Sequence, residues 1–325
     1  MNELTCRRRF LKTSLSTATA VALPDFAFSQ AYPSRPIRLI CPFTAGGSSD
    51  VILRTMAGVA GKILGGTVVV ENKPGASGSL GALELATARP DGYILSQLPF
   101  GVYTVPHMQK VTWHPMRDIS YIAHLTTYTN GLVVRGDSPI RSIKDFIDTA
   151  KARPGEITYG CAGLGTFAHL SAEEFAYRAG IKLLIVPYKG DADGLQALLG
   201  GHIMALSSSS VWAAQVDSGA CRLLASYGTK RIKRWASAPT LREIGFDTIP
   251  DSPFGIGAPK GMAPGLLENL QEAFRRTLED PSVSAVLDKY DMPVFYLGAS
   301  DYTRFSQQTY DTQKTTIARL GLSGA

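Results

Sequence analysis

Short apolar runs alternate with longer amphipathic segments in the first part of the chain. The runs PIRLIC, TVVVEN and YILSQLP have the length of buried strands. Between the first two, apolar residues such as Ile52, Met56 and Val59 recur at helical spacing, which predicts a helix from Asp50 to Leu64. A turn rich in Pro and Gly precedes a second predicted helix, GALELATA. Because strands joined by helical crossovers usually pair in parallel, this order predicts a mainly parallel α/β sheet.

The same alternation restarts after about residue 125. Strands are predicted at GLVVRG, ITYGCAG, KLLIVPY, HIMALSS and CRLLASYG, and a helix is predicted to begin after the N-cap residue Ser142. The rest of the chain contains the run FGIGAPKG and several predicted helices. Two such blocks, followed by a final segment that returns to the first block, predict two lobes, each a mainly parallel sheet flanked by helices. Residues 32–125 and 227–325 would form the first lobe, and residues 126–226 the second.

The first 31 residues follow a different pattern. The sequence RRRFLK at residues 7–12 precedes a weakly apolar stretch and the small-x-small tripeptide Ser29-Gln30-Ala31. This order is typical of a twin-arginine export signal; an amphipathic first helix of the mature fold is the alternative. No later segment approaches the ~20 apolar residues that span a bilayer. We therefore expect an exported, periplasmic protein.

Charge and cysteine usage narrow the choice of partners. The chain of 325 residues carries a net charge of +6, and loss of the signal removes four basic and two acidic residues, which leaves +4. This modest charge does not predict nucleic acid as a partner. Cys41, Cys161 and Cys221 remain, an odd number without C-x-x-C spacing, so buried thiols are expected instead of disulfides or a zinc site. We expect no cofactor and no metal.

A turn rich in Gly and Ser, PFTAGGSSD, joins the first predicted strand to the first predicted helix. The first backbone N–H groups of a helix lack internal partners, and the helix dipole adds about half a positive charge there. Such a turn can hold a carboxylate, because its glycines allow close approach and its hydroxyls can donate. Asp50 is expected to brace the helix. A plain turn with a Ser N-cap is an equally open alternative.

The segment GCAGLGTFAHL forms a second junction of this kind. Gly163-x-Gly165-x-x-Ala168 matches a dinucleotide fingerprint, but the following strand ends in PYKG where such a site needs an acidic residue. A second helix start that receives an anion, with Thr166 beside it, fits better. His169 is either near that anion or a packed helix residue.

Polar residues also follow the strand KLLIVPY. Tyr188 and Lys189 would lie at the carboxyl edge of a sheet, where open α/β folds bind their ligands; a solvated lysine and a capping aspartate are the alternative. No G-x-S-x-G elbow occurs, and the five histidines have no recognisable catalytic context. The run Ser207–Ser210 is interpreted as a turn from strand to helix.

Six blocks, in order, make the mature chain resemble the Bug-type receptors, the extracytoplasmic solute-binding proteins of tripartite tricarboxylate transporters. They are YPSRPIRLICPFTAGGSSD, VVVENKPGASGSLGA, ARPDGY, YGCAGLGTFAHL, VPYKG with LLGGHI, and FGIGAPKGMAP. The resemblance implies a periplasmic-binding-protein fold, in which two α/β lobes joined by two crossing strands close on a small carboxylated ligand. It also implies a non-enzymatic, monomeric receptor whose partners are that anion and the membrane permease subunits.

The resemblance also implies which residues bind. The loop at residues 43–50 and the loop at residues 162–166 would face each other across a cleft and hold a carboxylate through backbone N–H groups and bridging waters. The segments 75–79 and 188–190 would line the opening. The candidate ligand-binding residues are Phe43, Thr44, Gly46, Gly47, Ser48, Ser49, Asp50, Gly78, Ser79, Ala162, Gly163, Gly165, Thr166, His169, Tyr188, Lys189 and Gly190.

Several departures from the family pattern fall in the cleft. Thr44-Ala45 replaces the usual Pro-Pro or Ala-Pro, Pro253 stands where a Trp is common, and Ser207–Ser210 replaces a frequent Phe-Asp. These changes leave the ligand unassigned. An exported α/β serine hydrolase and a ligand sensor for a signalling partner are the alternative functions.

Overall fold

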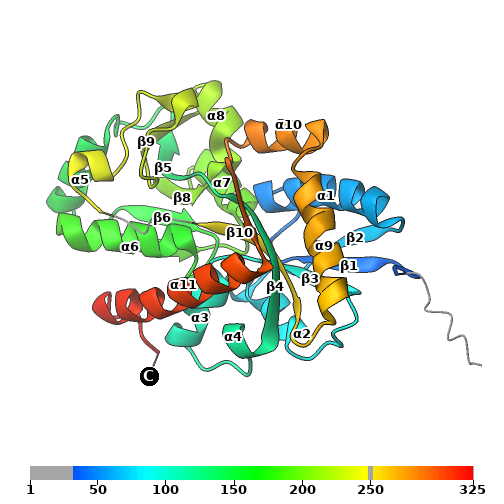
Figure 1. Ribbon diagram of the computed structural model, residues 1–325. Helices are drawn as coiled ribbons and strands as arrows, with labels where there is room; N and C mark the ends of the chain where they lie inside the picture. Colours follow the sequence, from blue (N-terminus) through cyan, green and yellow to red (C-terminus); the bar gives the residue numbers. More distant parts are fainter. Residues whose placement is uncertain (1–31, 248–251, 325) are drawn as a thin grey trace, which may run out of the picture. The chain divides into compact units, whose positions relative to one another are not determined.

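Two β-sheets flanked by helices make up the part of the chain that the computed structural model describes, residues 32–247 and 252–324 (Figure 1). The first sheet has six strands in the order β11-β4-β10-β3-β1-β2. Its strands are β1 (Ile37–Cys41), β2 (Val68–Asn72), β3 (Ile94–Leu98), β4 (Ile119–Thr127), β10 (Pro253–Pro259) and β11 (Val294–Gly298).

The second sheet has five strands in the order β7-β6-β8-β5-β9. They are β5 (Asn130–Arg135), β6 (Thr158–Cys161), β7 (Leu184–Pro187), β8 (Ala205–Ser209) and β9 (Cys221–Ser226). The predicted α/β class with two sheets is confirmed. The pairing is more mixed than expected, because strands pair in parallel around β1 and β6 but antiparallel around β10 and β5.

Besides the antiparallel pair of β11 with β4, the antiparallel pairs involve the strands next to the points where the chain changes sheets. Strand β4 belongs to the first sheet and β5 to the second, so the chain passes between them at residues 128–129. It returns between the end of β9 and β10, which inserts between β3 and β4 and runs opposite to both. A crossing near residue 125 therefore falls inside β4.

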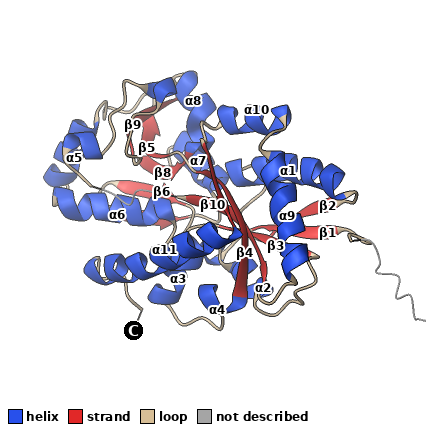
Figure 2. Cartoon of the chain, viewed as in Figure 1, coloured by secondary structure: helices blue, strands red, loops and turns tan. Residues whose placement is uncertain are grey.

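Helices cover both sheets (Figure 2). Their bounds are α1 (Ser48–Leu64), α2 (Leu80–Leu85), α3 (Gly101–Met108), α4 (Pro115–Asp118), α5 (Ile143–Ala152), α6 (Phe167–Ala179), α7 (Asp191–Leu199), α8 (Ala213–Asp217), α9 (Pro264–Thr277), α10 (Pro281–Lys289) and α11 (Ala299–Arg319). Ser142 caps α5 as predicted, in a reciprocal capping box with Asp145. The short helices α3 and α4 and the strands β4 and β11 were not predicted. Within the described residues, no helix has both the length and the apolar character needed to cross a membrane.

Apolar side chains from sheets and helices form the cores that hold this arrangement. Leu39, Ile52 and Phe274 are fully buried where the first sheet packs against α1 and α9. Phe146 and Phe175 are fully buried beside the second sheet. Each such side chain contributes roughly 1.5–3 kcal/mol by leaving water. These cores fix the strand ends from which the cavity-lining loops emerge.

Candidate functional site

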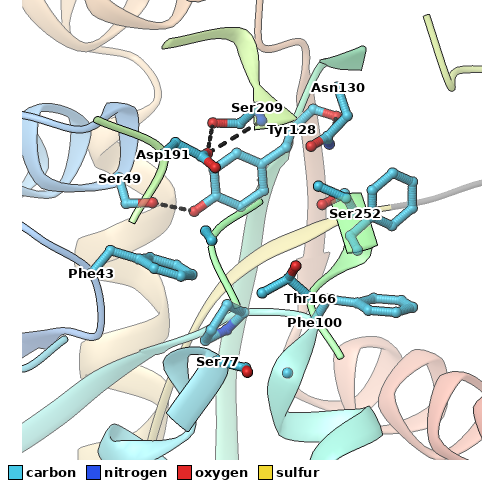
Figure 3. Close-up of a pocket in the computed structure, with 15 residues that line it drawn as sticks. Phe43, Ser49, Ser77, Phe100, Tyr128, Asn130, Thr166, Asp191, Ser209 and Ser252 are labelled. Atoms are coloured by element: carbon cyan, nitrogen blue, oxygen red, sulfur yellow. Dashed lines mark hydrogen bonds between the residues drawn. The ribbon is translucent and has the colours of Figure 1, made fainter. Parts of the chain in front are cut away.

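A cavity lies where the loops after β1 and β6 meet the residues that connect β4 to β5 (Figure 3). It contains about 410 Å³ of space between protein atoms, partly open to solvent, and a water molecule's centre can occupy about 40 Å³ of it. The cavity is lined by Phe43, Ser49, Ser77, Pro99, Phe100, Gly101, Tyr128, Asn130, Ala162, Thr166, Phe167, Ala168, Asp191, Ser209 and Ser252.

The β1–α1 loop brings the start of α1 to this cavity. Gly47, its N-cap, has no side chain to accept from the first-turn N–H groups, so the helix start is not capped by a side chain. Ser49 lines the cavity and its Oγ lies 2.6 Å from Tyr128 Oη. Ser48 Oγ lies 2.9 Å from Ser209 Oγ, at the end of β8.

Asp50 holds the β1–α1 loop in shape. Its buried carboxylate accepts hydrogen bonds from the Gly46 backbone N–H at 3.0 Å, from Arg54 Nε at 2.9 Å and from Asn72 Nδ2 at 2.8 Å. The first of these bonds secures Gly46 in a left-handed conformation with φ +83°, which suits glycine. Both carboxylate oxygens of Asp50 are engaged in these bonds, and the residue does not line the cavity. Asp50 therefore supports the loop.

The β6–α6 loop is supported in a similar manner. Gly165 N–H donates to His169 Nδ1 at 2.9 Å, and Thr104 Oγ1 donates to the Gly165 carbonyl at 2.6 Å. Burial lowers the pKa of His169 to about 4, so its ring is neutral at pH 7. Thr166 is the N-cap of α6, accepts from His169 N–H, and lines the cavity. His169 thus packs behind the loop and does not face the cavity.

Ser77 ties the two loop systems together. It has a left-handed φ of +56°, unusual for serine, and its Oγ donates to the carbonyl of Leu164 in the β6–α6 loop. Gly163, with φ +109°, faces it so closely that a Cβ there would lie 3.0 Å from Ser77 Oγ. Ser77 lies in the segment 75–79 that was expected to line the opening, but it was not among the candidate ligand-binding residues.

Asp191, the first residue of α7, is the charged residue of the described cavity lining. Its Oδ2 accepts hydrogen bonds from Ser209 N–H at 3.2 Å and from Ser209 Oγ. Burial raises the pKa of Asp191 to about 6. Ser207–Ser209 belong to β8 and are buried, which confirms the predicted strand HIMALSS at Ser207 and Ser208 and makes the predicted turn wrong up to Ser209. The pairing of Ser209 with Asn130 of β5 places both at the cavity.

The structure divides the predicted site residues into groups. Phe43, Ser49, Ala162 and Thr166 line the cavity. Gly163, Tyr188 and Lys189 line an open depression beside it, which shares Ser77 and Ala162 with the cavity. The remaining predicted residues lie outside both linings: Thr44, Gly46, Gly47, Ser48, Asp50, Gly78, Ser79, Gly165, His169 and Gly190.

Thr44 of the β1–α1 loop lies against Gly190, the N-cap of α7. A Cβ at Gly190 would lie 2.3 Å from Thr44 Oγ1, so the β1–α1 loop can approach α7 only because residue 190 is glycine. Thr44 Oγ1 is buried without a hydrogen-bond partner among the described residues.

Several lining residues were missed by the sequence analysis. Tyr128 comes from the connection between the sheets, Asn130 is the first residue of β5, and Phe100 and Gly101 lie at the unpredicted start of α3. None belongs to a glycine-rich junction, so no local motif marked them.

Comparisons with known proteins identify the family and the fold of this chain. Residues 52–322 match the family described as "Tripartite tricarboxylate transporter family receptor" (TctC). The chain is 42% identical to a UPF0065 protein of Cupriavidus necator over 98% of this chain and 99% of the relative. The solved periplasmic binding protein BugD is 28% identical, with a TM-score of 0.85 over 90% of this chain and 100% of that one.

An R. palustris protein solved with adipate is 26% identical, with a TM-score of 0.84 over 90% of this chain and 100% of that one. The family match begins inside α1, so the PFTAGGSSD turn lies before it, whereas the Cupriavidus necator relative spans nearly the whole chain. The fold, the sequence match and these solved structures agree, and the chain therefore belongs to the TctC family of tripartite tricarboxylate transporter receptors, which includes the Bug-type periplasmic binding proteins.

Proposed function

We propose that this chain is an exported periplasmic receptor that captures a small carboxylated anion and delivers it to the membrane permease of a tripartite tricarboxylate-type transporter. The observation that carries the proposal is the convergence of two helix starts on one cavity in a member of this family. Ser49 of α1 and Thr166 at the start of α6 line the same space.

The physical basis is electrostatic attraction without a cationic side chain. The described residues lining the cavity include no Lys, Arg or His. A carboxylate would instead be held by helix-end N–H groups, by nearby hydroxyls and by bridging waters. The side-chain-free N-cap Gly47 leaves the start of α1 available for this. The adipate bound by the R. palustris protein is a ligand of the proposed chemistry.

Closure would follow from the same arrangement. Phe43 and Ser49 follow β1 of the first sheet, whereas Thr166 follows β6 and Ser209 ends β8, both strands of the second sheet. A ligand that engages both sets favours the state in which they are close, because only that state provides all the contacts.

A ligand screen tests the proposal. Purified protein would be titrated by calorimetry and thermal shift with dicarboxylates, acidic amino acids and aromatic carboxylates, with neutral sugars and cationic peptides for comparison. Binding at 100-fold above Kd should stabilise the protein by about 2.7 kcal/mol, a readily measured rise in Tm. No response to any carboxylate, together with tight binding of sugars or cationic peptides, would refute the anion assignment.

We also propose that the receptor is not an enzyme. His169 Nδ1 accepts from a backbone N–H, and burial lowers its pKa to about 4, so it is a weak base at pH 7. A serine-reactive phosphonate should therefore leave the protein unlabelled. Labelling of one serine beside His169 would favour the hydrolase alternative.

Export and delivery have separate tests. Residues 1–31 lie outside the described residues, so the twin-arginine signal stays a prediction from sequence. Amino-terminal sequencing of the periplasmic protein should locate cleavage near residue 31, and replacement of Arg7, Arg8 and Arg9 should abolish export. Copurification with membrane permease subunits would support the transport role over a sensor.

A further inference from the structure

We infer that Asp191 selects for ligands that carry a protonated amino group beside the carboxylate, so that the preferred class is amino acids over plain carboxylic acids. This inference rests on the proposed function and names the ligand class of the same cavity. It arises from a carboxylate that the proposed anion site does not itself require.

The first observation is the isolation of the Asp191 charge. Within the described part of the chain, no Lys, Arg or His forms an ion pair with Asp191. Both hydrogen bonds that its carboxylate accepts go to Oδ2, from Ser209. Oδ1 is therefore available to a ligand, and Figure 3 shows the side chain at the cavity beside Ser209 and Tyr128.

The second observation is the link between this negative charge and the start of α1. Ser209 Oγ bonds to Asp191 Oδ2 and also lies 2.9 Å from Ser48 Oγ. Because a hydroxyl has one proton, Ser209 donates to Asp191 and accepts from Ser48. The positive end of α1 and the negative carboxylate are thus separated by two side-chain hydroxyls.

A zwitterionic ligand complements both the positive end of α1 and the negative carboxylate of Asp191. Its carboxylate would occupy the helix end while its ammonium group, on the neighbouring carbon, would donate to Asp191 Oδ1. A plain carboxylate would bring a second negative charge next to Asp191 with no cation in the lining to offset it. The alternative that fits a plain carboxylate is a protonated Asp191 that donates to the ligand.

Matched ligand pairs test the inference directly. Aspartate and succinate, glutamate and glutarate, and phenylalanine and 3-phenylpropionate differ only in the amino group. Calorimetry at pH 7.5 should give the amino member of the binding pair at least tenfold higher affinity. D191N should lose that preference, whereas D193N, exposed on the same first turn of α7, should keep it.

The outcomes separate the two proposals. Equal or tighter binding of the acid without an amino group would overturn the Asp191 inference and leave the anion receptor standing. A preference that survives in D191N would also overturn it. Binding of simple amines without any carboxylate would overturn the proposed function instead. No binding of any amino acid, when the wider screen finds a plain carboxylate that binds, would overturn the Asp191 inference and leave the anion receptor standing.

The pH dependence is a second readout. With a pKa of about 6, Asp191 loses its charge below that pH, so amino-acid affinity should fall about tenfold between pH 7.5 and pH 5. The affinity of a plain carboxylate held by protonated Asp191 would rise instead. The titratable groups that interact with Asp191, Tyr128 and Cys161, stay neutral in this range because burial holds their pKa values well above 7.

Discussion

The substitution D191N should stabilise the unliganded protein at neutral pH. Asp191 ionises with a pKa of about 6 in the folded chain, against an ordinary value of 3.8, because burial disfavours its charge. Below pH 3.8 both states are protonated and no effect arises. As pH rises from 3.8 to 6, the unfolded chain releases its proton first, so stability falls, and the full cost is present above pH 6.

The difference of 2.2 pKa units corresponds to about 3 kcal/mol of lost stability at pH 7.5. Asparagine removes this cost and keeps an oxygen that can accept from Ser209 N–H. Its amide N–H₂ and the weakened bond to Ser209 Oγ offset about 1 kcal/mol. The net gain is therefore about 2 kcal/mol at pH 7.5, or roughly 4–8 °C in Tm. At pH 4.5 the same reasoning leaves a gain near zero.

Urea or thermal denaturation of wild type, D191N and D193N at pH 7.5 and pH 4.5 measures this effect. D193N removes a charge from the same first turn of α7 and so corrects for the helix dipole. A D191N variant that is less stable than wild type at pH 7.5, or whose gain is the same at both pH values, would refute the reasoning. A gain in stability with a loss of amino-acid binding would identify Asp191 as a functional residue that costs stability.

Three further predictions follow from contacts between the loops and from buried histidines. G190A should weaken ligand affinity at least tenfold, because its Cβ would clash with Thr44 Oγ1. In a double-mutant cycle measured by calorimetry, T44A should relieve part of that loss. Additive effects of the two substitutions would contradict the contact. S77A should accelerate ligand release several-fold in stopped-flow measurements with little change in Tm, since it removes one hydrogen bond between the loops. An unchanged release rate would show that the Ser77 bond does not help to hold the loops closed on the ligand. Burial lowers the pKa values of His124 and His169 to about 4, so the unfolded chain binds protons first as pH falls through 6.5. The free energy of unfolding should therefore drop by about 3 kcal/mol per histidine at and below pH 4. Denaturation midpoints that do not change between pH 7 and pH 4.5 would contradict this.

Much of the fold was predictable because it depends on local patterns. Buried strands such as β1 and amphipathic helices such as α1 differ in period along the sequence, and their alternation predicted two α/β sheets. The helix α3 was missed because its sequence, GVYTVPHM, contains Pro106 and β-branched residues that disfavour a helix in isolation. Tertiary packing overrides that preference, since Val102 and Tyr103 are fully buried.

The candidate site was only partly predictable for a different reason. Glycine-rich turns after strands are local signals, so the start of α1 and the start of α6 were both identified. Asp50 and His169 belong to those signals but serve to shape the loops. Which residues face the cavity depends on how loops distant in sequence approach each other, and no spacing rule records that.

The amino-acid sequence by itself determined the order of strands and helices, the two glycine-rich turns and the family resemblance, because each is encoded by neighbouring residues. The tertiary structure alone decided that Tyr128, Asn130 and Ser209 meet at one cavity, through the register of β5 against β8. It also placed Asp191, partly buried and without a cationic partner among the described residues, at this cavity, where desolvation raises its pKa. The pKa of a carboxyl group depends on surroundings that only folding assembles, and for that reason Asp191 could not be singled out from the sequence.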